Sequence, residues 1–482
     1  MSKKVTKKKR KALNIFFNVV CLISTIIMLI FCYCLYKLNM IPTKFLYLIY
    51  GALGIIYLIM ILITLPPKVK VSIKTFCLVL FIILGTIFGF ANKYIFDTMD
   101  FMSILDKEVF QKERYAVMIL SKSNVKSIEE LNGKSIASYK SSNSEKAIEE
   151  LNKKVKVDNN EFSDVEKMFD SLENGEVSAV VVSSSVEKLL DSELKDMNLD
   201  LKTIYEFKIS IKKEDIVKVV NVTNTPFNVY IAGGDGYGSI DITYNTDVNM
   251  IATIDPVNRK ILLTSIPRDY WVNLVGQGPD AYDKLTHAGY YGIQESVKDL
   301  ENLLDIDINY YVKVNFSTIE GIVDAIGGVD VYSDYDFYEN AFGIYHFVEG
   351  NNHLNGKQAL AFARERRAFG AGDLQRVKDQ QKVVEAIINK MTSSTALISG
   401  YEKILNSVSE NLDTNMSSKD IQKLVKMQLN DMRGWSVESQ NPTGTTRYGG
   451  TYTFPTMTLY SMVPDSESLN QTKTKIKEYL GK

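Results

Sequence analysis

Three long runs without a charged residue dominate the hydrophobic pattern of the N-terminal part of the chain. They span residues 12–36, 45–67 and 75–92, and each is mostly apolar. A bilayer core of about 30 Å takes about 20 helical residues at a rise of 1.5 Å, so all three runs are long enough to cross it, the third near the minimum. Buried core helices are the alternative, which three successive runs disfavour. The pattern predicts three transmembrane helices between residues 12 and 92.

Lysine and arginine placement predicts the orientation of these helices. The tail of residues 1–11 holds seven cations and no acid, and the loop between the second and third runs carries more lysines than the loop between the first and second. Positive residues stay on the cytoplasmic side. We therefore expect a multi-pass cell-membrane protein with a cytoplasmic N-terminus and with everything after about residue 92 outside. No small-residue cleavage site follows the first run, which argues against a cleavable signal peptide.

The exterior part begins with a helical connector, 93–112, followed by short β-rich and helical runs over residues 113–215. Strands are expected at 115–120, 134–140 and 178–184, and helices at 144–154 and 163–175, with Ser163 as N-cap and Gly175 as stop signal. This alternation predicts a small α/β accessory domain. It weakly resembles half of a periplasmic solute-binding fold, and no convergent polar site is evident in it.

A second α/β domain is expected over residues 216–482. Strands are predicted at 226–238, 247–255, 260–274, 308–315, 329–334, 435–439 and 454–463, and helices at 296–304, 317–327, 374–391 and 466–480. Strands alternating with helices predict a central mixed sheet flanked by helices.

Charge and cysteine content exclude some classes of function. A net charge of −1 argues against a nucleic-acid binder that works by bulk attraction, and eleven basic-tail residues are too few to form a recognition module. All four cysteines lie in the apolar runs, so the exterior part can form no disulfide. Its three histidines are scattered, which excludes a Cys/His metal cluster.

One stretch, residues 361–381, concentrates cations. Between Arg364 and Lys378 it carries Arg364, Arg366, Arg367, Arg376 and Lys378 against only Glu365 and Asp373. A solvated helix face, or structural ion pairing with Glu365 and other acids, is one interpretation. An anion-binding clamp is the other, because the guanidinium fork matches phosphate oxygens in pairs.

The helical periodicity favours the clamp. If Asp373 caps a helix over 374–391, then Val377, Val384, Ile388 and Met391 share one face, and Arg376 and Gln380 lie at its edge. An inward arginine is costly without a partner. Arg364 and Arg366 share a face only in an extended segment, so the helix that begins near Leu354 must end by about Ala363, leaving Arg367 facing away.

Acidic residues follow or open two of the predicted strands. Asp235 lies in the turn GGDGYG, and Asp247 lies in NTDVNM. Strand ends are where α/β sheets place ligand groups. Two carboxylates with phosphate oxygens suit Mg²⁺, although turn capping is the alternative for each acid alone. Arg268, next to Asp269 after a strand, is either a salt-bridge residue or a phosphate contact.

The ordered motifs GGDGYG, NTDVNM, SIPRDY, DKLTHAGYYG, INYYVKVNF, AIGGVDV, HLNGKQALAFARER and GDLQRVKDQQ closely resemble the LytR-CpsA-Psr (LCP) family of Gram-positive cell-envelope proteins. The resemblance covers residues 216–400 strongly and the C-terminal part loosely. Three membrane helices with an extra exterior domain resemble its capsule-assembly, CpsA-like branch.

The resemblance implies a phosphotransferase. Family members move a glycopolymer (capsular polysaccharide or a teichoic-acid-like polymer) from a polyprenyl-pyrophosphate carrier to peptidoglycan and release polyprenyl phosphate, assisted by Mg²⁺ or Mn²⁺. The expected partners are therefore this lipid-linked polymer, peptidoglycan, membrane lipid and other capsule or cell-wall assembly proteins, with no nucleic acid. The prenyl tail requires an apolar channel, to which the helix at 317–327 can contribute.

Residue roles follow by motif position. Asp247, Arg268 and Arg376 are implied as catalytic residues, with Asp247 as base and Asp235 and Asp247 as metal ligands. The implied pyrophosphate clamp consists of Arg268, Arg364, Arg366, Arg376, Gln380 and, as a weaker candidate, Lys284. His287 is expected to be structural.

Two positions depart from the family pattern. Asn245 replaces an arginine two residues before Asp247, and Leu374 replaces an arginine or other polar residue. Losing the first arginine removes a phosphate contact. A non-catalytic scaffold or regulator of capsule assembly that binds the lipid-linked polymer is therefore the alternative function.

Overall fold

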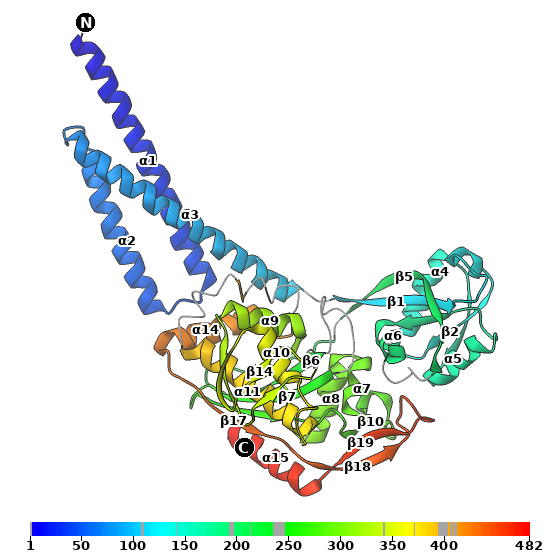
Figure 1. Ribbon diagram of the computed structural model, residues 1–482. Coiled ribbons are helices and arrows are strands. Elements are labelled where there is room, and N and C mark those ends of the chain that lie inside the picture. The colour runs from blue at the N-terminus through cyan, green and yellow to red at the C-terminus, as the bar shows by residue number, and fades with distance from the viewer. Residues whose placement is uncertain are drawn as a thin grey trace. The chain divides into compact units, whose positions relative to one another are not determined.

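The chain forms two compact units in the computed structural model (Figure 1). One consists of Met1–Lys107 with Ser417–Arg433, and the other of Glu108–Met416 with Gly434–Lys482. The structure describes residues 2–107, 110–141, 143–191, 197–212, 214–234, 246–340, 343–370, 372–393, 403–404, 407 and 412–482.

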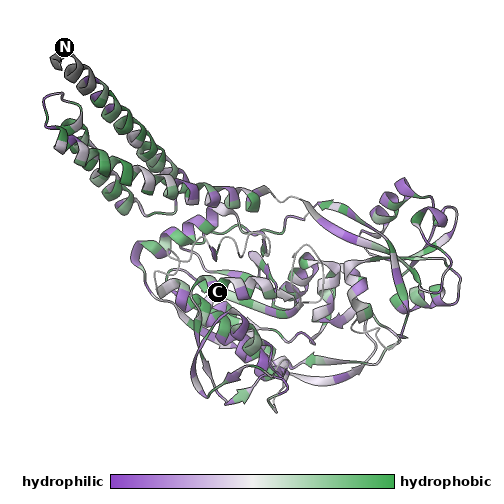
Figure 2. Ribbon diagram, turned by 45° about the horizontal axis from the view of Figure 1, so that its top comes forward, coloured by the Kyte–Doolittle hydropathy of each residue, from purple (hydrophilic) through white to green (hydrophobic). Residues whose placement is uncertain are grey.

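The first unit consists of α1 (Ser2–Leu38), α2 (Thr43–Thr64), α3 (Val71–Lys107) and α14 (Ser418–Asp431). Within α1, α2 and α3, three segments have the length and apolar composition needed to cross a membrane: Lys11–Leu38, Thr43–Thr64 and Val71–Asp106. In the ribbon of Figure 2, most of their residues have the green of hydrophobic side chains. The third helix continues through most of the expected connector because neither proline nor glycine interrupts it after Gly89.

Polar side chains of the membrane helices find partners among themselves. The Ser24 hydroxyl donates to the Phe81 carbonyl oxygen at 2.8 Å and lies 3.0 Å from the Tyr57 hydroxyl. The Lys74 ammonium donates to Asn14 Oδ1 at 3.0 Å. Such pairing is required where no water can hydrogen-bond to buried polar groups.

The second unit begins with a five-stranded sheet of order β3-β2-β4-β1-β5. Its elements are β1 (Phe110–Leu120), β2 (Ser135–Tyr139), α4 (Ser144–Lys154), β3 (Asp158–Phe162), α5 (Val165–Glu173), β4 (Val180–Ser183), α6 (Ser184–Asp191) and β5 (Leu201–Lys212). Alternate residues of β4 belong to two different hydrophobic clusters, so both faces of this strand are buried. That burial explains its continuous apolar run.

The start of α5 differs from the prediction by one residue. Asp164, not Ser163, is the N-cap, because its carboxylate accepts from the backbone nitrogens of Glu166 and Lys167. Gly175 has φ of +74° just past the helix, as its predicted stop role requires.

The remainder of the second unit contains a six-stranded mixed sheet of order β16-β11-β6-β7-β8-β17. Its strands are β6 (Phe227–Gly234), β7 (Thr246–Asp255), β8 (Lys260–Ser265), β11 (Tyr310–Val314), β16 (Leu412–Thr414) and β17 (Ser436–Gln440). β6 pairs with β11 in parallel and with β7 antiparallel, and β8 pairs antiparallel with β7 and parallel with β17. The predicted α/β fold with a mixed sheet is confirmed.

Helices and short strand pairs complete this part. The helices are α7 (Leu285–Ala288), α8 (Ile293–Leu304), α9 (Phe316–Ala325), α10 (Gly356–Arg364), α11 (Asp373–Ser393) and α15 (Ser466–Tyr479). The predicted strand at 329–334 forms β12 (Val329–Ser333), which pairs with β15 (Gly350–Leu354) in a separate ribbon. β19 (Leu459–Pro464) pairs with β18 (Gly444–Gly449), and β9 (Trp271–Asn273) with β10 (Tyr282–Lys284).

One face of the central sheet packs into a hydrophobic core, and the other face lines a cavity. Tyr230, Ala232 and Ile251 belong to a core cluster that also contains residues of α8 and α15. The alternating residues Ile231 and Met250 instead line a cavity. Because successive strand residues point to opposite faces, this cavity lies on the other side of the sheet from that core.

Candidate functional site

A cavity of about 810 Å³ separates strands β6 and β7 from helices α9, α10 and α11. Much of its wall is apolar, and the apolar residues are Ile231, Val248, Met250, Val314, Phe316, Ile319, Ile344, Leu360, Ala361, Ala363, Val383 and Val384. They come from both the sheet and the helices, including the α9 segment expected to contribute to an apolar channel. This wall suits a hydrocarbon chain.

The polar part of the same cavity collects the predicted basic residues. Asp247, Arg268, Arg364, Arg366, Arg376 and Gln380 all line it. Arg367 lines it as well, although the sequence analysis placed Arg367 facing away. Arg367 lies in the turn after α10, where neither helical nor strand periodicity predicts the direction of a side chain.

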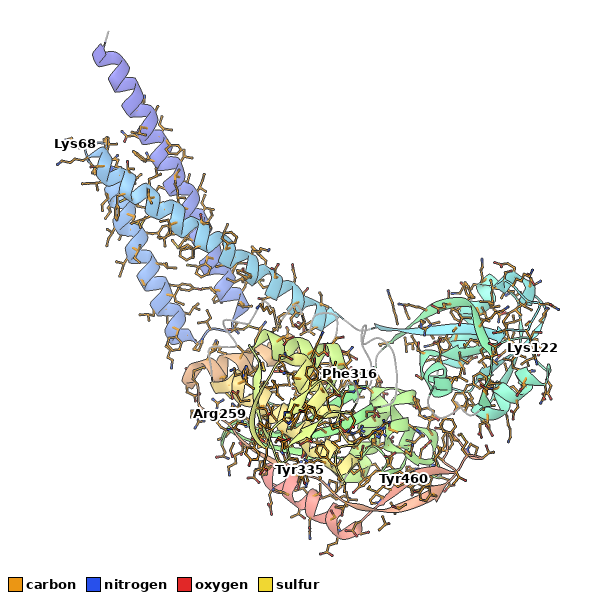
Figure 3. All side chains as sticks on the ribbon, viewed as in Figure 1. Lys68, Lys122, Arg259, Phe316, Tyr335 and Tyr460 are labelled. Atoms are coloured by element: carbon orange, nitrogen blue, oxygen red, sulfur yellow. The ribbon has the colours of Figure 1, made fainter. Side chains whose placement is uncertain are left out.

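Helix α10 ends close to the position that the spacing of Arg364 and Arg366 predicts. Asn355 caps its start by accepting from the Gln358 backbone nitrogen at 3.0 Å. The last helical residue is Arg364, one residue beyond the predicted limit, and Glu365 is extended with φ −67° and ψ 133°. The Arg364 guanidinium carbon lies 4.2 Å from the ring centroid of Phe316, labelled in Figure 3.

Glu365 holds the turn that carries these arginines. Its Oε1 accepts from the backbone nitrogens of Arg366, Arg367 and Ala368 at 2.8, 2.6 and 2.9 Å. Its Oε2 accepts from the Asn340 backbone nitrogen at 2.5 Å. Burial alone raises the pKa of Glu365, but the hydrogen bonds from Asn340 and the turn outweigh it and lower the pKa. Glu365 therefore orders the basic turn instead of neutralising an arginine side chain.

Asp247 and Arg268 form an ion pair at the cavity wall. Arg268 Nη1 donates to Asp247 Oδ1 at 2.7 Å, and Arg268 Nε lies 3.7 Å from Asp269 Oδ2. Burial lowers the pKa of Arg268, but Asp247 and Asp269 raise it by more, so the net shift is upward. Arg268 is thus a permanent cation held by two carboxylates.

Arg376 is the most buried of the clamp arginines, at 8 % exposure. Its Nη2 lies 2.6 Å from Asp373 Oδ1. Burial lowers its pKa, and the neighbouring cations Arg268 and Arg366 lower it further, against Asp373 and Asp247. A buried cation whose pKa is lowered by neighbouring cations lies in a site that a bound anion would relieve.

Two of the buried N–H groups at this wall have no acceptor. The Nε atoms of Arg268 and Arg376 make no hydrogen bond with any residue that the structure describes. An unsatisfied buried donor is costly, and the cost is larger for a charged group. A phosphate oxygen would satisfy both groups.

The buried face of α11 differs from the predicted one. The predicted stripe of Val377, Val384, Ile388 and Met391 is only partly buried, whereas the buried residues are Gln375, Arg376, Asp379, Gln381, Val383 and Ala386. Polar groups are buried here because they have partners. Gln381 Nε2, for example, donates to the carbonyl oxygens of Leu263 and Gln440 at 3.2 and 3.1 Å. A hydrophobic wheel does not detect such a face.

Lys284 does not line the cavity. Its ammonium is buried and lies 3.6 Å from Asp269 Oδ1, on the carboxylate that also faces Arg268. The structure therefore places it behind Arg268, because β10 pairs with β9 instead of ending at the cavity. His287 is fully buried, with Nδ1 2.6 Å from Asp283 Oδ1.

The proposed metal site is only partly described. Asp235 and Asn245 lie outside the described residues. Within the described ranges, no group of three or more His, Cys, Asp or Glu side chains could hold a metal ion. Asp247 lies beside a β-bulge at Gly233 and Gly234, where the β6–β7 register shifts. Bulges commonly re-aim side chains next to active sites.

The sequence analysis did not predict several residues that belong to this site. Arg367 and Asn340 line the cavity, Glu365 organises the basic turn, and Asp269 and Asp373 balance the buried arginines. The sequence signal for Glu365 was that it is the single acid within an arginine run directly after a helix. The sequence does not show that this carboxylate accepts from backbone N–H groups and not from guanidinium groups, because that depends on three-dimensional geometry.

Comparison with known proteins gives two family matches. The LytR_cpsA_psr family matches residues 195–478, and a family described as NMT1/THI5 like matches residues 106–225.

Curated relatives match the same part of the chain. The polyisoprenyl-teichoic acid–peptidoglycan teichoic acid transferase TagU of Bacillus mycoides is 36% identical over 257 residues, covering 52% of this chain and 78% of that protein. TagU of Bacillus cereus is 38% identical over 205 residues, covering 42% of this chain and 65% of that protein.

Among solved structures, TagV of B. subtilis is 29% identical with a TM-score of 0.46, covering 54% of this chain and 98% of that one. TagT bound to LIIa-WTA is 29% identical with a TM-score of 0.45, covering 55% of this chain and 95% of that one. The family match spans more than half of the chain, and it contains the cavity and its arginines. The chain belongs to the LytR-CpsA-Psr family.

Proposed function

We propose that this protein transfers a glycopolymer from a polyprenyl-pyrophosphate carrier to peptidoglycan and releases polyprenyl phosphate. The observation that carries the proposal is one cavity with two chemistries. Its apolar wall suits the prenyl chain, and its arginine wall, with two buried N–H groups that find no acceptor among the described residues, suits the pyrophosphate. The named activity of the TagU relatives supports the same reaction class.

The reaction needs positioning and charge neutralisation more than covalent help from the protein. The acceptor sugar hydroxyl attacks the phosphorus that bears the glycopolymer, a new O–P bond forms, and the bond to the polyprenyl phosphate breaks. Asp247 takes the hydroxyl proton. Arg268, Arg366 and Arg376 stabilise the charge that develops on the phosphate oxygens, and Arg364, Arg367 and Gln380 complete the clamp.

A divalent cation fits the chemistry of Asp247. Hard cations prefer oxygen ligands and keep waters, and Arg268 contacts Oδ1 of a carboxylate that has two oxygens. We propose Mg²⁺, with Mn²⁺ as a substitute, held by Asp247, by Asp235 and by substrate phosphate oxygens. Bound there, it would neutralise pyrophosphate charge.

The membrane helices give the reaction its location. With the basic tail in the cytoplasm, the cavity would face the outside of a Gram-positive-type envelope, where carrier lipid and peptidoglycan meet. Tethering to the membrane raises the effective concentration of a lipid-borne donor. The three helices and the accessory domain favour capsular polysaccharide or a teichoic-acid-like polymer as cargo, with other envelope-assembly proteins as partners.

The test uses the full chain in lipid nanodiscs. Synthetic lipid-pyrophosphate oligosaccharide, peptidoglycan fragments and Mg²⁺ are added, and the phosphodiester product is measured by mass spectrometry. We expect Asp247→Ala and Arg376→Ala to lower transfer by about 10²–10³-fold, the scale for losing one charge-stabilising contact. Arg433→Ala, at an exposed arginine outside the cavity, is the matched control and should leave transfer unchanged.

Two outcomes would contradict the proposal. Wild-type protein that binds the lipid but yields no product would favour the scaffold role. Transfer that persists in Arg376→Ala would place the chemistry outside this cavity.

A further inference from the structure

Helix α14 belongs to the same compact unit as α1, α2 and α3, although in sequence it lies between two strands of the central sheet. Its C-terminal half contacts the connection between α1 and α2. The Lys426 ammonium donates to Asn39 Oδ1 at 2.9 Å. In the other direction, the Lys44 ammonium donates to the Asn430 carbonyl oxygen at 2.6 Å. Each side of the contact contributes one lysine, and the two hydrogen bonds hold α14 beside the ends of α1 and α2.

With the three apolar spans in a bilayer, the connection between α1 and α2 lies at the level of the lipid headgroups. Asn39 directly follows the first span, Lys11–Leu38. Lys44 is the second residue of the next span, Thr43–Thr64. Three exposed tyrosines lie close to these positions in sequence: Tyr33, Tyr36 and Tyr47. Because tyrosine is enriched where helices leave the hydrocarbon core, and lysine reaches from there into the headgroup layer, the C-terminal half of α14 is placed in that layer.

The N-terminal end of α14 is fixed to α3. The Ser418 backbone nitrogen and hydroxyl donate to Asp106 Oδ1 and Oδ2 at 2.9 and 2.6 Å. Asp106 ends the third apolar segment, and Asp97 and Asp100 precede it, so acidic residues mark the part of α3 that has left the hydrocarbon core. Because both ends of α14 are fixed, the helix cannot rotate freely about its axis. The face that meets the connection between α1 and α2 is therefore defined.

That face of α14 and the connection together carry a group of lysines, the interfacial lysine cluster. Its members are Lys37, Lys44, Lys419, Lys423 and Lys426. Lys419 and Lys423 lie seven and three residues before Lys426, which places all three on one side of the helix. In the described part of the chain, Lys423 is the one member with a carboxylate at ion-pair distance, Asp420 at 2.8 Å. The cluster thus has more ammonium groups than acid partners.

An excess of ammonium groups at headgroup depth attracts lipid phosphate. Each lysine near an anionic membrane surface strengthens binding by about fivefold. Lysine carries its three donors on a flexible stem, which suits a phosphate whose position is not fixed, whereas arginine presents a rigid fork. A zwitterionic headgroup carries its own cation beside its phosphate and therefore offsets less of the lysine charge. An anionic phospholipid is the class of ligand that this cluster fits.

We propose that the interfacial lysine cluster binds the phosphate groups of anionic phospholipid, and that the C-terminal half of α14 lies in the headgroup layer of the membrane. The bulk anionic lipid of the bilayer is the occupant, not the carrier of the glycopolymer. The site is separate from the arginine cavity, and it does not depend on the transferase reaction.

The first test measures acetylation of individual lysines by mass spectrometry, on the full chain in nanodiscs. One set of discs contains phosphatidylcholine alone, and the other contains equal parts of phosphatidylcholine and phosphatidylglycerol. We expect Lys419 and Lys423 to be acetylated about fivefold more slowly in the anionic discs. Lys146, an exposed lysine of α4 in the other compact unit, is the internal control and should react at the same rate in both.

The second test measures retention of phosphatidylglycerol by the full chain with native mass spectrometry. Lys419→Gln combined with Lys423→Gln should weaken retention by about fivefold for each lysine, or about 25-fold together. The contacts of Lys44 and Lys426 remain, so the double variant should unfold at the wild-type temperature. Lys419→Arg combined with Lys423→Arg keeps both charges and should retain the lipid like the wild type, as should the control Lys146→Gln.

Three results would overturn the proposal. One is equal acetylation of Lys419 and Lys423 in the two kinds of disc. Another is retention of phosphatidylglycerol at the wild-type level by the folded double glutamine variant. The third is protection of these lysines by added polyprenyl phosphate alone and not by phosphatidylglycerol, which would assign the cluster to the carrier lipid.

Discussion

Glu365 provides the sharpest test of how the basic turn is built. Four backbone N–H groups, from Arg366, Arg367, Ala368 and Asn340, donate to this one carboxylate. Hydrogen bonds to charged groups contribute about 1.5–3 kcal/mol each. Residues 366–368 are exposed, so water replaces part of what is lost. With about 0.5–1 kcal/mol per bond for that reason, Glu365→Ala should destabilise the closed turn by about 2–4 kcal/mol.

Hydrogen exchange measures this loss directly. At about 1.4 kcal/mol per factor of ten, the amides of residues 366–368 should exchange about 30- to 700-fold faster in Glu365→Ala. Glu365→Gln retains one acceptor oxygen and should give about a tenfold increase. Glu349→Ala, at an exposed acid of the same domain, is the control and should leave these amides unchanged.

The same carboxylate gives a pH dependence with a defined sign. The pKa of Glu365 is lowered on folding. Its contribution is therefore fully present above the unfolded-state pKa of about 4.5 and is lost as the pH falls through the folded-state value. Exchange at residues 366–368, corrected for intrinsic rates, should accelerate on acidification in the wild type alone. Unchanged protection in Glu365→Ala would refute the assigned role of this carboxylate.

Other positions give simpler predictions, each measured by unfolding of the full chain. Burial raises the pKa of Asp299 from 3.8 to about 8, so its contribution is present below pH 3.8 and is lost as the pH rises through about 8. Asp299 should contribute a fall in stability of about 1.4 kcal/mol per pH unit between pH 5 and 7.5, so Asp299→Asn should make the measured slope shallower by that amount; an unchanged slope would contradict the assignment. Gly356→Ala places a methyl group 2.3 Å from the Glu320 carbonyl oxygen and should cost about 1–3 kcal/mol, whereas wild-type stability would show that α9 and α10 separate easily. Asp164→Ala should cost about 1 kcal/mol and Ser163→Ala almost nothing, and the reverse order would restore Ser163 as the cap.

Several features could be predicted from the sequence because their signals are local. An apolar run long enough for a bilayer needs no tertiary information, and the three spans are found in α1, α2 and α3. Strand alternation placed β6, β7, β8 and β11, and the two-residue spacing of Arg364 and Arg366 predicted the end of α10 to within one residue.

Which residues line the cavity and which are buried elsewhere could be determined only from the folded structure. Arg367 lines the cavity and Lys284 does not, although both lie in basic, motif-bearing segments. Burial of polar residues on α11 depends on acceptors from strands more than fifty residues away in sequence. The predicted strand at 329–334 pairs in its own ribbon, which its alternation alone could not distinguish from a place in the central sheet.

Chain-local patterns thus determined the membrane spans, the α/β class and the identity of the clustered arginines, since these depend on composition and on periods of two and 3.6 residues. Only the tertiary structure decided that one carboxylate orders the basic turn, that two guanidinium N–H groups find no acceptor in the described part of the chain, and that residues of the accessory domain line a second cavity together with residues 276–298. The physical reason is that hydrogen-bond satisfaction depends on which distant atoms come within about 3 Å, and the sequence order of those atoms does not encode that distance.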